Sequence, residues 1–124
     1  MEKEPLQEEE IKHILTDLLT RDGWDVQTAW GHALGADIDA RKAGERWILE
    51  VKGPGKANAE SKYFDNVLGE ILRRMDDPDA RYSIVFPDKK VFRDRWAKLP
   101  QLAKERTMID LLLVDSDGSI DRLA

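Results

Sequence analysis

The segment GADIDARKAGERWILEVKG, residues 35–53, predicts a β-hairpin with an isolated acid on its first strand and a Glu-x-Lys triplet on its second. Side chains alternate between the two faces of a strand, so Glu50 and Lys52 project together on one face. The apolar residues that alternate with them project to the other face, where they can be buried. The second strand therefore has one face for the core and one face for chemistry.

The turn of this hairpin determines which acid faces Glu50. If the dipeptide Ala43-Gly44 lies at the centre of the turn, pairing outward places Asp37 directly opposite Glu50. A bulge in the turn would instead move Asp39 or Gly35 into that place. In the simplest register two carboxylates face each other, with Cβ atoms roughly 4.5–5.5 Å apart.

Two opposed carboxylates favour a bound cation. Like charges directly opposite each other on neighbouring strands destabilise a sheet unless positive charge lies between them. Mg²⁺ takes oxygen ligands and is usually held by one or two carboxylates together with substrate phosphate. Asp37 and Glu50 therefore predict a site for Mg²⁺ or Mn²⁺, and Lys52 is placed to stabilise negative charge in a transition state.

The size and composition of the chain indicate one globular domain over residues 1–124. The 124 residues suffice for one core and are too few for two. The sequence has no cysteine, which excludes disulfides and thiolate metal ligands and fits a reducing cytoplasm. The acidic start lacks the apolar core of a signal peptide, and no stretch approaches the roughly 18 apolar residues of a membrane span. We therefore expect a cytoplasmic protein without a membrane partner.

The charge of the chain is acidic overall and basic locally. The formal net charge of −5 argues against a surface that coats nucleic acid, because phosphate binding depends on clustered Lys and Arg. Two basic groups remain, Arg73-Arg74 and a run from Lys89 to Lys98. The sequence leaves open whether they bind phosphate or form ordinary solvated helix faces.

Hydrophobic periodicity predicts the remaining elements. A first helix ends at Asp22-Gly23, and strands are expected over 24–30, 37–41 and 46–51. They are followed by a helix over 61–75, a strand over 82–86, a helix over 91–106 that is kinked near Pro100, and an apolar strand over 108–114. The order is αβββαβαβ. The long helical connection between the third and fourth strands implies parallel pairing in a covered α/β sheet.

These features together resemble the PD-(D/E)xK restriction-endonuclease-like superfamily over nearly the whole chain. The resemblance is carried by a first helix ending in Gly23-Trp24, a Gly-x-Asp-Ile turn at 35–38 and an apolar strand ending in Glu-x-Lys-Gly at 50–53. The chain is most similar to the Mrr-type and Holliday-junction-resolvase-like branches, and residues 21–24 with 68–70 resemble XisH-like proteins. The motif itself is short and degenerate, so its strand context and the element order matter most.

The resemblance implies a three-layer αβα fold with a central mixed sheet, and the activity of a metal-dependent nuclease. It assigns Asp37 and Glu50 to the metal ion and the backbone carbonyl of Val51 to a further ligand position. Lys52 takes the position of the catalytic lysine.

Two other positions matter for this assignment. Many members of the superfamily add a glutamate from the first helix, and among Glu8-Glu9-Glu10 we favour Glu10. The preferred interpretation of all three glutamates is nevertheless a solvated acidic helix start that the helix dipole stabilises. Relatives often carry Gly-Gln on the helix after Glu-x-Lys, whereas this chain has Gly69-Glu70. Glu70 would add negative charge near a phosphate site, either as an extra metal ligand or as a salt-bridge partner.

The function expected from these residues is hydrolysis of phosphodiester bonds in nucleic acid, with DNA the favoured substrate. The candidates for substrate binding are Lys56, Lys62, Glu70, Arg73 and Arg74. The alternative is a catalytically inactive, nuclease-like binding or assembly module, which the net acidity and Glu70 would suit. All three core positions are filled, and two opposed carboxylates cost stability without a metal, so catalysis is the preferred hypothesis.

A homodimer is a further hypothesis, because paired sites match the two strands of a duplex. Trp96, Leu99 and Leu102 are the candidate interface, although ordinary packing of their helix on the sheet is the preferred interpretation. Neither His13 nor His32 has a second ligand at metal spacing, so we expect no zinc site.

Overall fold

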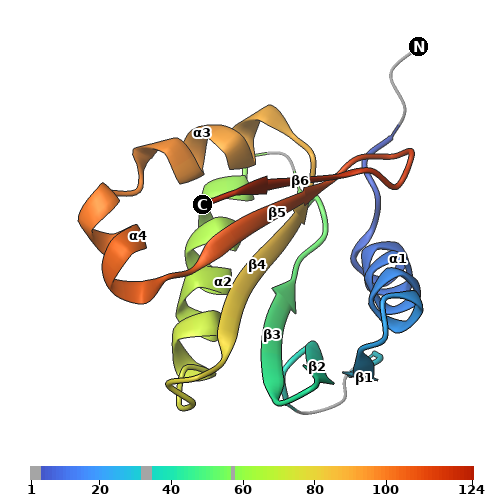
Figure 1. The fold of residues 1–124 in the computed structure, drawn as a ribbon. Helices are drawn as coiled ribbons and strands as arrows, with labels where there is room; N and C mark the ends of the chain where they lie inside the picture. The colour runs from blue at the N-terminus through green and yellow to red at the C-terminus, as the bar shows by residue number, and fades with distance from the viewer. Residues whose placement is uncertain (1–3, 32–34, 57) are drawn as a thin grey trace.

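The computed structural model describes residues 4–31, 35–56 and 58–124, which form a six-stranded sheet with helices on both faces (Figure 1). The strands are β1 (Asp25–Thr28), β2 (Ile38–Lys42), β3 (Glu45–Val51), β4 (Arg81–Pro87), β5 (Asp110–Val114) and β6 (Ile120–Leu123). The helices are α1 (Glu8–Arg21), α2 (Glu60–Arg73), α3 (Lys90–Lys98) and α4 (Gln101–Thr107). The strands lie across the sheet in chain order.

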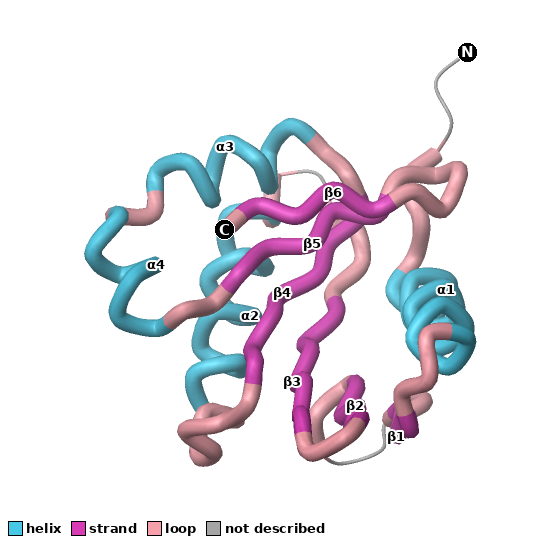
Figure 2. Tube along the Cα trace, viewed as in Figure 1, coloured by secondary structure: helices cyan, strands magenta, loops and turns pink. Residues whose placement is uncertain are grey.

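The sheet is mixed, as the sequence predicts. β3–β4 and β4–β5 are parallel pairs, whereas β1–β2, β2–β3 and β5–β6 are antiparallel pairs. Parallel strands need a long crossover, and α2 supplies it between β3 and β4 (Figure 2). The predicted crossover is therefore confirmed.

The helices form two layers on opposite faces of the sheet (Figure 1). On one face α1 buries Ile11 in a cluster with Leu49 of β3. On the other face Phe64 of α2 and Phe92 of α3 stack on Phe86 of β4, with ring centroids 5.6 and 4.1 Å apart. The chain therefore has the three-layer αβα arrangement of the restriction-endonuclease-like fold.

The helix expected over 91–106 is divided into α3 and α4 at Pro100. Proline disfavours helical dihedrals in the residue before it, and Leu99 is extended, with φ −68° and ψ 129°. Pro100 then occupies the N-cap of α4. None of the helices in the described part of the chain combines the length and the apolar character needed to cross a membrane.

A sixth strand, β6, follows β5 after a turn and was not among the predicted elements. The turn is closed by the amide of Asp115, which donates to the carbonyl of Ser119 at 2.8 Å. The chain then returns antiparallel to β5, with Val114 opposite Ile120. The element order is therefore longer than the predicted αβββαβαβ, although the fold class is unchanged.

The β2–β3 turn has the predicted register. Ala43 and Gly44 both have positive φ, at 49° and 83°, as a two-residue turn between twisted antiparallel strands requires. Arg41 lies opposite Arg46, with no bulge in the ladder between β2 and β3. The hairpin therefore presents its polar residues as the alternation of strand side chains predicts.

Candidate functional site

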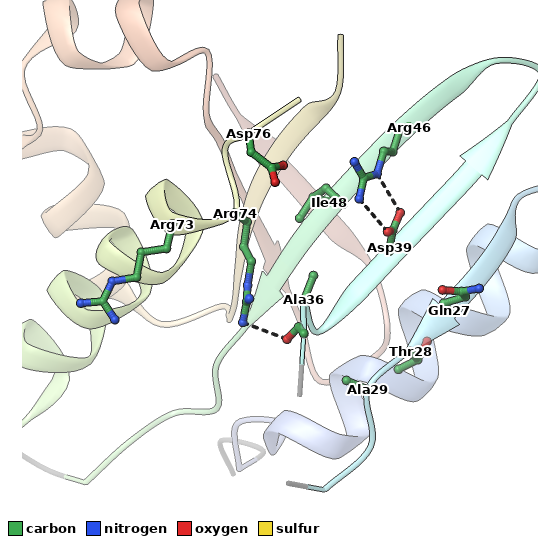
Figure 3. A pocket seen from close by; sticks show the side chains of 11 residues that line it. Gln27, Thr28, Ala29, Ala36, Asp39, Arg46, Ile48, Arg73, Arg74 and Asp76 are labelled. Atoms are coloured by element: carbon green, nitrogen blue, oxygen red, sulfur yellow. Dashed lines mark hydrogen bonds and ion pairs between the residues drawn. The ribbon is translucent and has the colours of Figure 1, made fainter. Parts of the chain in front are cut away.

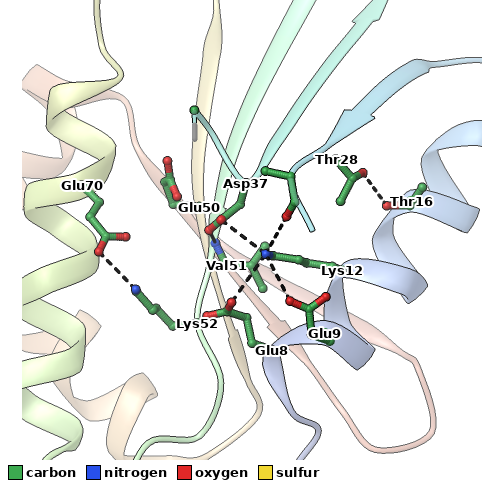
Figure 4. A network of polar contacts seen from close by, with 12 residues as sticks. Glu8, Glu9, Lys12, Thr16, Thr28, Asp37, Glu50, Val51, Lys52 and Glu70 are labelled. Atoms are coloured by element: carbon green, nitrogen blue, oxygen red, sulfur yellow. Dashed lines mark hydrogen bonds and ion pairs between the residues drawn. The ribbon is translucent and has the colours of Figure 1, made fainter. Parts of the chain in front are cut away.

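Asp37 and Glu50 lie side by side at the open end of the β2–β3 hairpin (Figure 4). Asp37 immediately precedes β2, and continuing the observed register places it opposite Glu50 of β3. Asp37 is close enough to Glu50 for its negative charge to raise the pKa of the Glu50 carboxyl. The structure therefore brings together the two predicted metal ligands.

Asp37 is held by the backbone on both sides of the site. Its Oδ2 accepts a hydrogen bond from the amide of Val51 at 2.8 Å, and its own carbonyl accepts one from the amide of Ala29, also at 2.8 Å. Asp39, the alternative ligand if the turn contained a bulge, accepts hydrogen bonds from Arg46 at 3.0 and 3.2 Å instead. Asp37 is therefore the acid that faces the site.

Glu50 is a buried carboxylate with a cationic partner. Only 2% of the residue is exposed, and its Oε1 accepts a hydrogen bond from Nε of Arg74 at 2.8 Å. Burial, followed by hydrogen bonding and charge repulsion from Asp37, raises the pKa of Glu50 to about 8, although Arg74 acts in the opposite direction. The pair of carboxyl groups therefore needs additional positive charge, or a proton, to be stable at neutral pH.

Lys52 lies on the same side of the site and is paired with Glu70 of α2. The Lys52 Nζ is 3.1 Å from the Glu70 Oε1. Burial lowers the pKa of Lys52, but hydrogen bonding to Glu70 and the nearby charges of Glu8 and Asp37 outweigh it, so the pKa is raised. Lys52 is therefore a positive charge beside the carboxylate pair, and Glu70 is a salt-bridge partner in this structure.

Lys12 is a site residue that the sequence analysis did not identify. Only 1% of it is exposed, and its Nζ donates to the carbonyl of Ala29 at 2.8 Å and lies 3.5 Å from Oδ1 of Asp37. Burial lowers the pKa of Lys12, but Asp37, Glu8 and Glu9 outweigh it and raise the pKa. A signal was present in the sequence, because a lysine directly after Ile11 and three residues before Leu15 lies on the buried stripe of the helix.

The glutamate favoured on the first helix, Glu10, is not brought to this site. Its Oε1 accepts a hydrogen bond from the backbone amide of Gln7 at 3.0 Å, as part of a capping box at the start of α1. Glu8 and Glu9 instead lie 3.5 and 3.6 Å from Nζ of Lys12. Gly53 permits this approach of the helix, because a Cβ there would lie 3.1 Å from the backbone nitrogen of Glu8.

The predicted substrate-binding cations fall into two groups. Within the described part of the chain, the side chains of Lys56, Lys62 and Arg73 are exposed and make no hydrogen bond or ion pair. Arg74 is instead engaged with Glu50 and with the carbonyl of Gly35, to which Nη2 donates at 2.9 Å. Three of the four basic candidates are therefore available to a ligand, and the fourth, Arg74, is bound to Glu50 of the carboxylate pair.

A cavity of about 530 Å³ adjoins this site, between the β1–β2 side of the sheet and the end of α2 (Figure 3). Arg74 lines one side of it, and the ion pair of Asp39 with Arg46 lies on the strands opposite. The cavity walls are thus formed by the same segments that hold the two carboxylates.

Four of the five cations in the second basic run, on and before α3, are paired with local acids, and Lys98 has no ion pair among the described residues. The ion pairs of the run are Lys89–Glu60, Lys90–Asp94, Arg93–Asp88, Arg93–Asp121 and Arg95–Asp65, at 2.7–3.6 Å. Trp96 of the same helix is 3% exposed and packs in the core, as the preferred interpretation had it. A homodimer remains a prediction.

The two histidines are not brought into the site by the described contacts. His13 stacks on Trp30, with ring centroids 4.4 Å apart. His32 lies outside the described residues.

The residues at the carboxylate pair fit a divalent cation. No group of three or more His, Cys, Asp or Glu side chains suited to a metal occurs in the described ranges, so a cation here would have two carboxylate ligands. Asp37 and Glu50 meet the one-or-two-carboxylate pattern of Mg²⁺, which completes its shell with water and substrate oxygens. Burial, and then the charge of Asp37, raises the pKa of Glu50, and a divalent cation between the two carboxylates would offset both effects.

The chain shares its fold with solved structures of low sequence identity. An XisH family protein from Nostoc punctiforme superposes with a TM-score of 0.61 at 18% identity, over 92% of this chain and 98% of that protein. An fdxN element excision controlling factor protein from Anabaena variabilis gives a TM-score of 0.61 at 20% identity, over 90% and 96%. No protein-family model and no curated protein matches the chain. These similarities establish the αβα restriction-endonuclease-like fold and assign no residue role.

Proposed function

We propose that this protein is a metal-dependent nuclease that hydrolyses phosphodiester bonds in DNA, with Mg²⁺ or Mn²⁺ as its cofactor. The observation that carries this proposal is the placement of Asp37 opposite the buried Glu50, with Lys52 beside them. Asp37 and Glu50 would hold the ion, with the carbonyl of Val51 as a further oxygen. A divalent ion at such a site supplies charge stabilisation and a more acidic water.

The residues of the chain have separate roles in this proposal. Lys52 stabilises the negative charge that develops on the phosphate, and Glu70 keeps its ammonium group in place, 3.1 Å away. Lys56, Lys62 and Arg73 supply exposed positive charge for flanking phosphates. DNA is placed first among the substrates because one structural neighbour is named as an element excision controlling factor.

One observation favours the second candidate, a catalytically inactive binding or assembly module. Each acid already has a cation of the chain beside it, since Lys12 lies 3.5 Å from Asp37 and Arg74 lies 2.8 Å from Glu50. Such internal neutralisation would let the two carboxylates persist without a metal. The two candidates differ in one measurable property, which is the response of the protein to divalent ions.

The test combines thermal melting with a nuclease assay. Ligand binding to the native state raises the melting temperature, so Mg²⁺ or Mn²⁺ should stabilise the wild-type protein and leave Asp37→Asn unaffected. Asp39→Asn is the matched control, because it lies on the same hairpin and pairs with Arg46 rather than with Glu50. Linear, branched and single-stranded DNA, together with RNA, are then incubated with wild type and with Lys52→Ala.

Cleavage by wild type that is lost in Lys52→Ala supports the nuclease. Equal cleavage by both proteins would overturn the role of Lys52. A wild-type protein that shows neither metal stabilisation nor cleavage would favour the inactive module.

A further inference from the structure

Arg74 links the two halves of the candidate site. It follows directly after α2, and its Nε lies 2.8 Å from Oε1 of Glu50 while its Nη2 donates to the carbonyl of Gly35 at 2.9 Å. The side chain is 39% exposed and lines the cavity of about 530 Å³. One guanidinium therefore contacts a proposed metal ligand and lines an open cavity at the same time.

Arg73 provides a natural comparison. It precedes Arg74 in the chain, is exposed, and makes no hydrogen bond or ion pair with the described residues. In Figure 3 the Arg73 side chain extends away from Glu50's partner Arg74. The two arginines carry the same charge at nearly the same place, and only one of them occupies a carboxylate of the site.

A divalent ion on Glu50 would compete with this arginine. The ion needs oxygen lone pairs of Glu50, one of which now accepts the Arg74 hydrogen bond. Two cations on one carboxylate also repel each other. Binding of the ion therefore weakens the hold of Glu50 on Arg74, and the guanidinium keeps a planar set of donors that matches a phosphate group.

We propose that Arg74 is a phosphate-binding residue under control of the metal ion. It is the counter-ion of Glu50 when the metal is absent, and it binds the DNA backbone at the cavity when the metal has replaced it. This inference rests on the proposed function, because the ion and the phosphate are those of the nuclease site. A displaceable Arg74 explains why an arginine is hydrogen-bonded to a carboxylate that we expect to bind a metal ion.

The proposal makes two predictions of opposite sign for one substitution. In Arg74→Gln the competing charge is gone, so metal binding becomes tighter, while a phosphate ligand is lost and DNA binding becomes weaker. If Arg74 had only a structural role, the substitution would not tighten metal binding. Loss of its contacts with Gly35 and Glu50 would instead loosen the site and weaken metal binding. Glutamine is preferred to alanine because its amide can still donate to the Gly35 carbonyl.

The metal arm uses calorimetric titration of Mn²⁺ into wild type, Arg74→Gln and Arg73→Gln, in the absence of DNA. Arg74→Gln should bind Mn²⁺ roughly 3- to 10-fold more tightly, which is the range of a partly exposed ion pair. Arg73→Gln should bind as wild type does.

The DNA arm uses anisotropy of a fluorescein-labelled duplex with Mg²⁺, in the Lys52→Ala background so that the duplex is not cut. Arg74→Gln should weaken binding by roughly 10-fold or more, as expected for a charged hydrogen bond. Arg73→Gln should weaken it less. Arg74→Lys keeps the charge without the planar donors, so it should bind Mn²⁺ like wild type and DNA more weakly.

The outcomes separate this inference from the proposed function. Mn²⁺ binding that Asp37→Asn abolishes but Arg74→Gln leaves equal or weaker would overturn the inference alone. A wild-type protein that binds no Mn²⁺ would overturn the proposed function and this inference with it. If Arg74→Gln does not fold, Arg74→Lys carries the test, and unchanged DNA affinity in that variant would overturn the inference.

Discussion

Glu50 is a buried acid with a raised pKa, and its protonation should be visible in the stability of the fold. Its pKa is raised from 4.5 to about 8, so between these values the folded state keeps a proton that the unfolded state releases. The free energy of unfolding then decreases as pH rises through this window. Glu50→Gln is neutral at every pH and lacks this dependence.

We predict that the free energy of unfolding of Glu50→Gln, relative to that of wild type, increases from pH 5.5 to pH 8. EDTA is present to exclude metals. The slope of the difference should be on the order of 1 kcal/mol per pH unit, because one unit of pKa shift corresponds to about 1.4 kcal/mol. Urea denaturation at several pH values measures it. Glu105→Gln, at an exposed position on α4, is the control. Its free energy of unfolding should change with pH as that of wild type does. A constant offset between Glu50→Gln and wild type would contradict the prediction.

Among the individual residues of the site, the sequence predicts the pair of acids but not their cationic partners. Asp37 and Glu50 follow from strand alternation and from a two-residue turn, which are local properties. Lys12 and Arg74 reach the site from helices distant in the sequence, and only the packing of α1 and α2 on the sheet brings them there. Glu10 stays away from the site because the capping box, a local hydrogen-bond requirement, takes its carboxylate.

The β2–β3 hairpin is the element on which the site depends, and its turn contains a strained residue. Ala43 has φ 49°, a left-handed conformation that asparagine and glycine adopt more readily. Ala43→Asn should therefore stabilise the protein by about 0.5–1 kcal/mol, because Asn-Gly is the preferred sequence for this turn. Ala43→Val should destabilise it, since a β-branched residue disfavours positive φ. Urea denaturation tests both, and a destabilised Ala43→Asn would contradict the strain argument.

Helix α2 contains Gly69 in its interior, at an exposed position where an added Cβ meets no atom within 4 Å. Gly69→Ala should therefore stabilise the fold by about 0.5–1 kcal/mol, which is the helix-propensity difference. Leu72→Ala, exposed on the same helix, is a control for surface substitution and should change stability less. A stabilised Gly69→Ala with weakened DNA binding would show that Gly69 is needed for close approach of the substrate.

The elements that the sequence missed are those whose formation depends on partners. β6 has four residues, mostly exposed, with no apolar alternation to mark it, and it exists because β5 offers an edge for pairing. By contrast, four of the five residues of β5 are apolar, which predicts a strand buried on both faces, and every residue of β5, including Asp110, is buried. Elements with a strong burial pattern were therefore predicted, and an edge strand was not.

For the molecule as a whole, the net charge of −5 limits how nucleic acid can bind. Four of the five cations in the run on and before α3 are already paired with acids, so we assign the positive face to Lys56, Lys62, Arg73 and the metal-released Arg74. Nucleic acid should therefore bind to one side of the sheet only. This distinguishes the protein from one that coats nucleic acid with its entire surface.

The salt dependence of DNA binding measures this directly. Two to four phosphate contacts predict a slope of log K against log salt of about −2 to −4 for duplex DNA, because each contact contributes about −0.9. Arg73→Gln should reduce the slope by about 1, whereas Lys90→Gln should leave it unchanged because Lys90 pairs with Asp94 at 2.7 Å. Anisotropy titrations with Mg²⁺ in the Lys52→Ala background provide the measurement. An equal loss of slope in both variants would place phosphate contacts on α3 and would move the DNA-binding face away from the carboxylate pair.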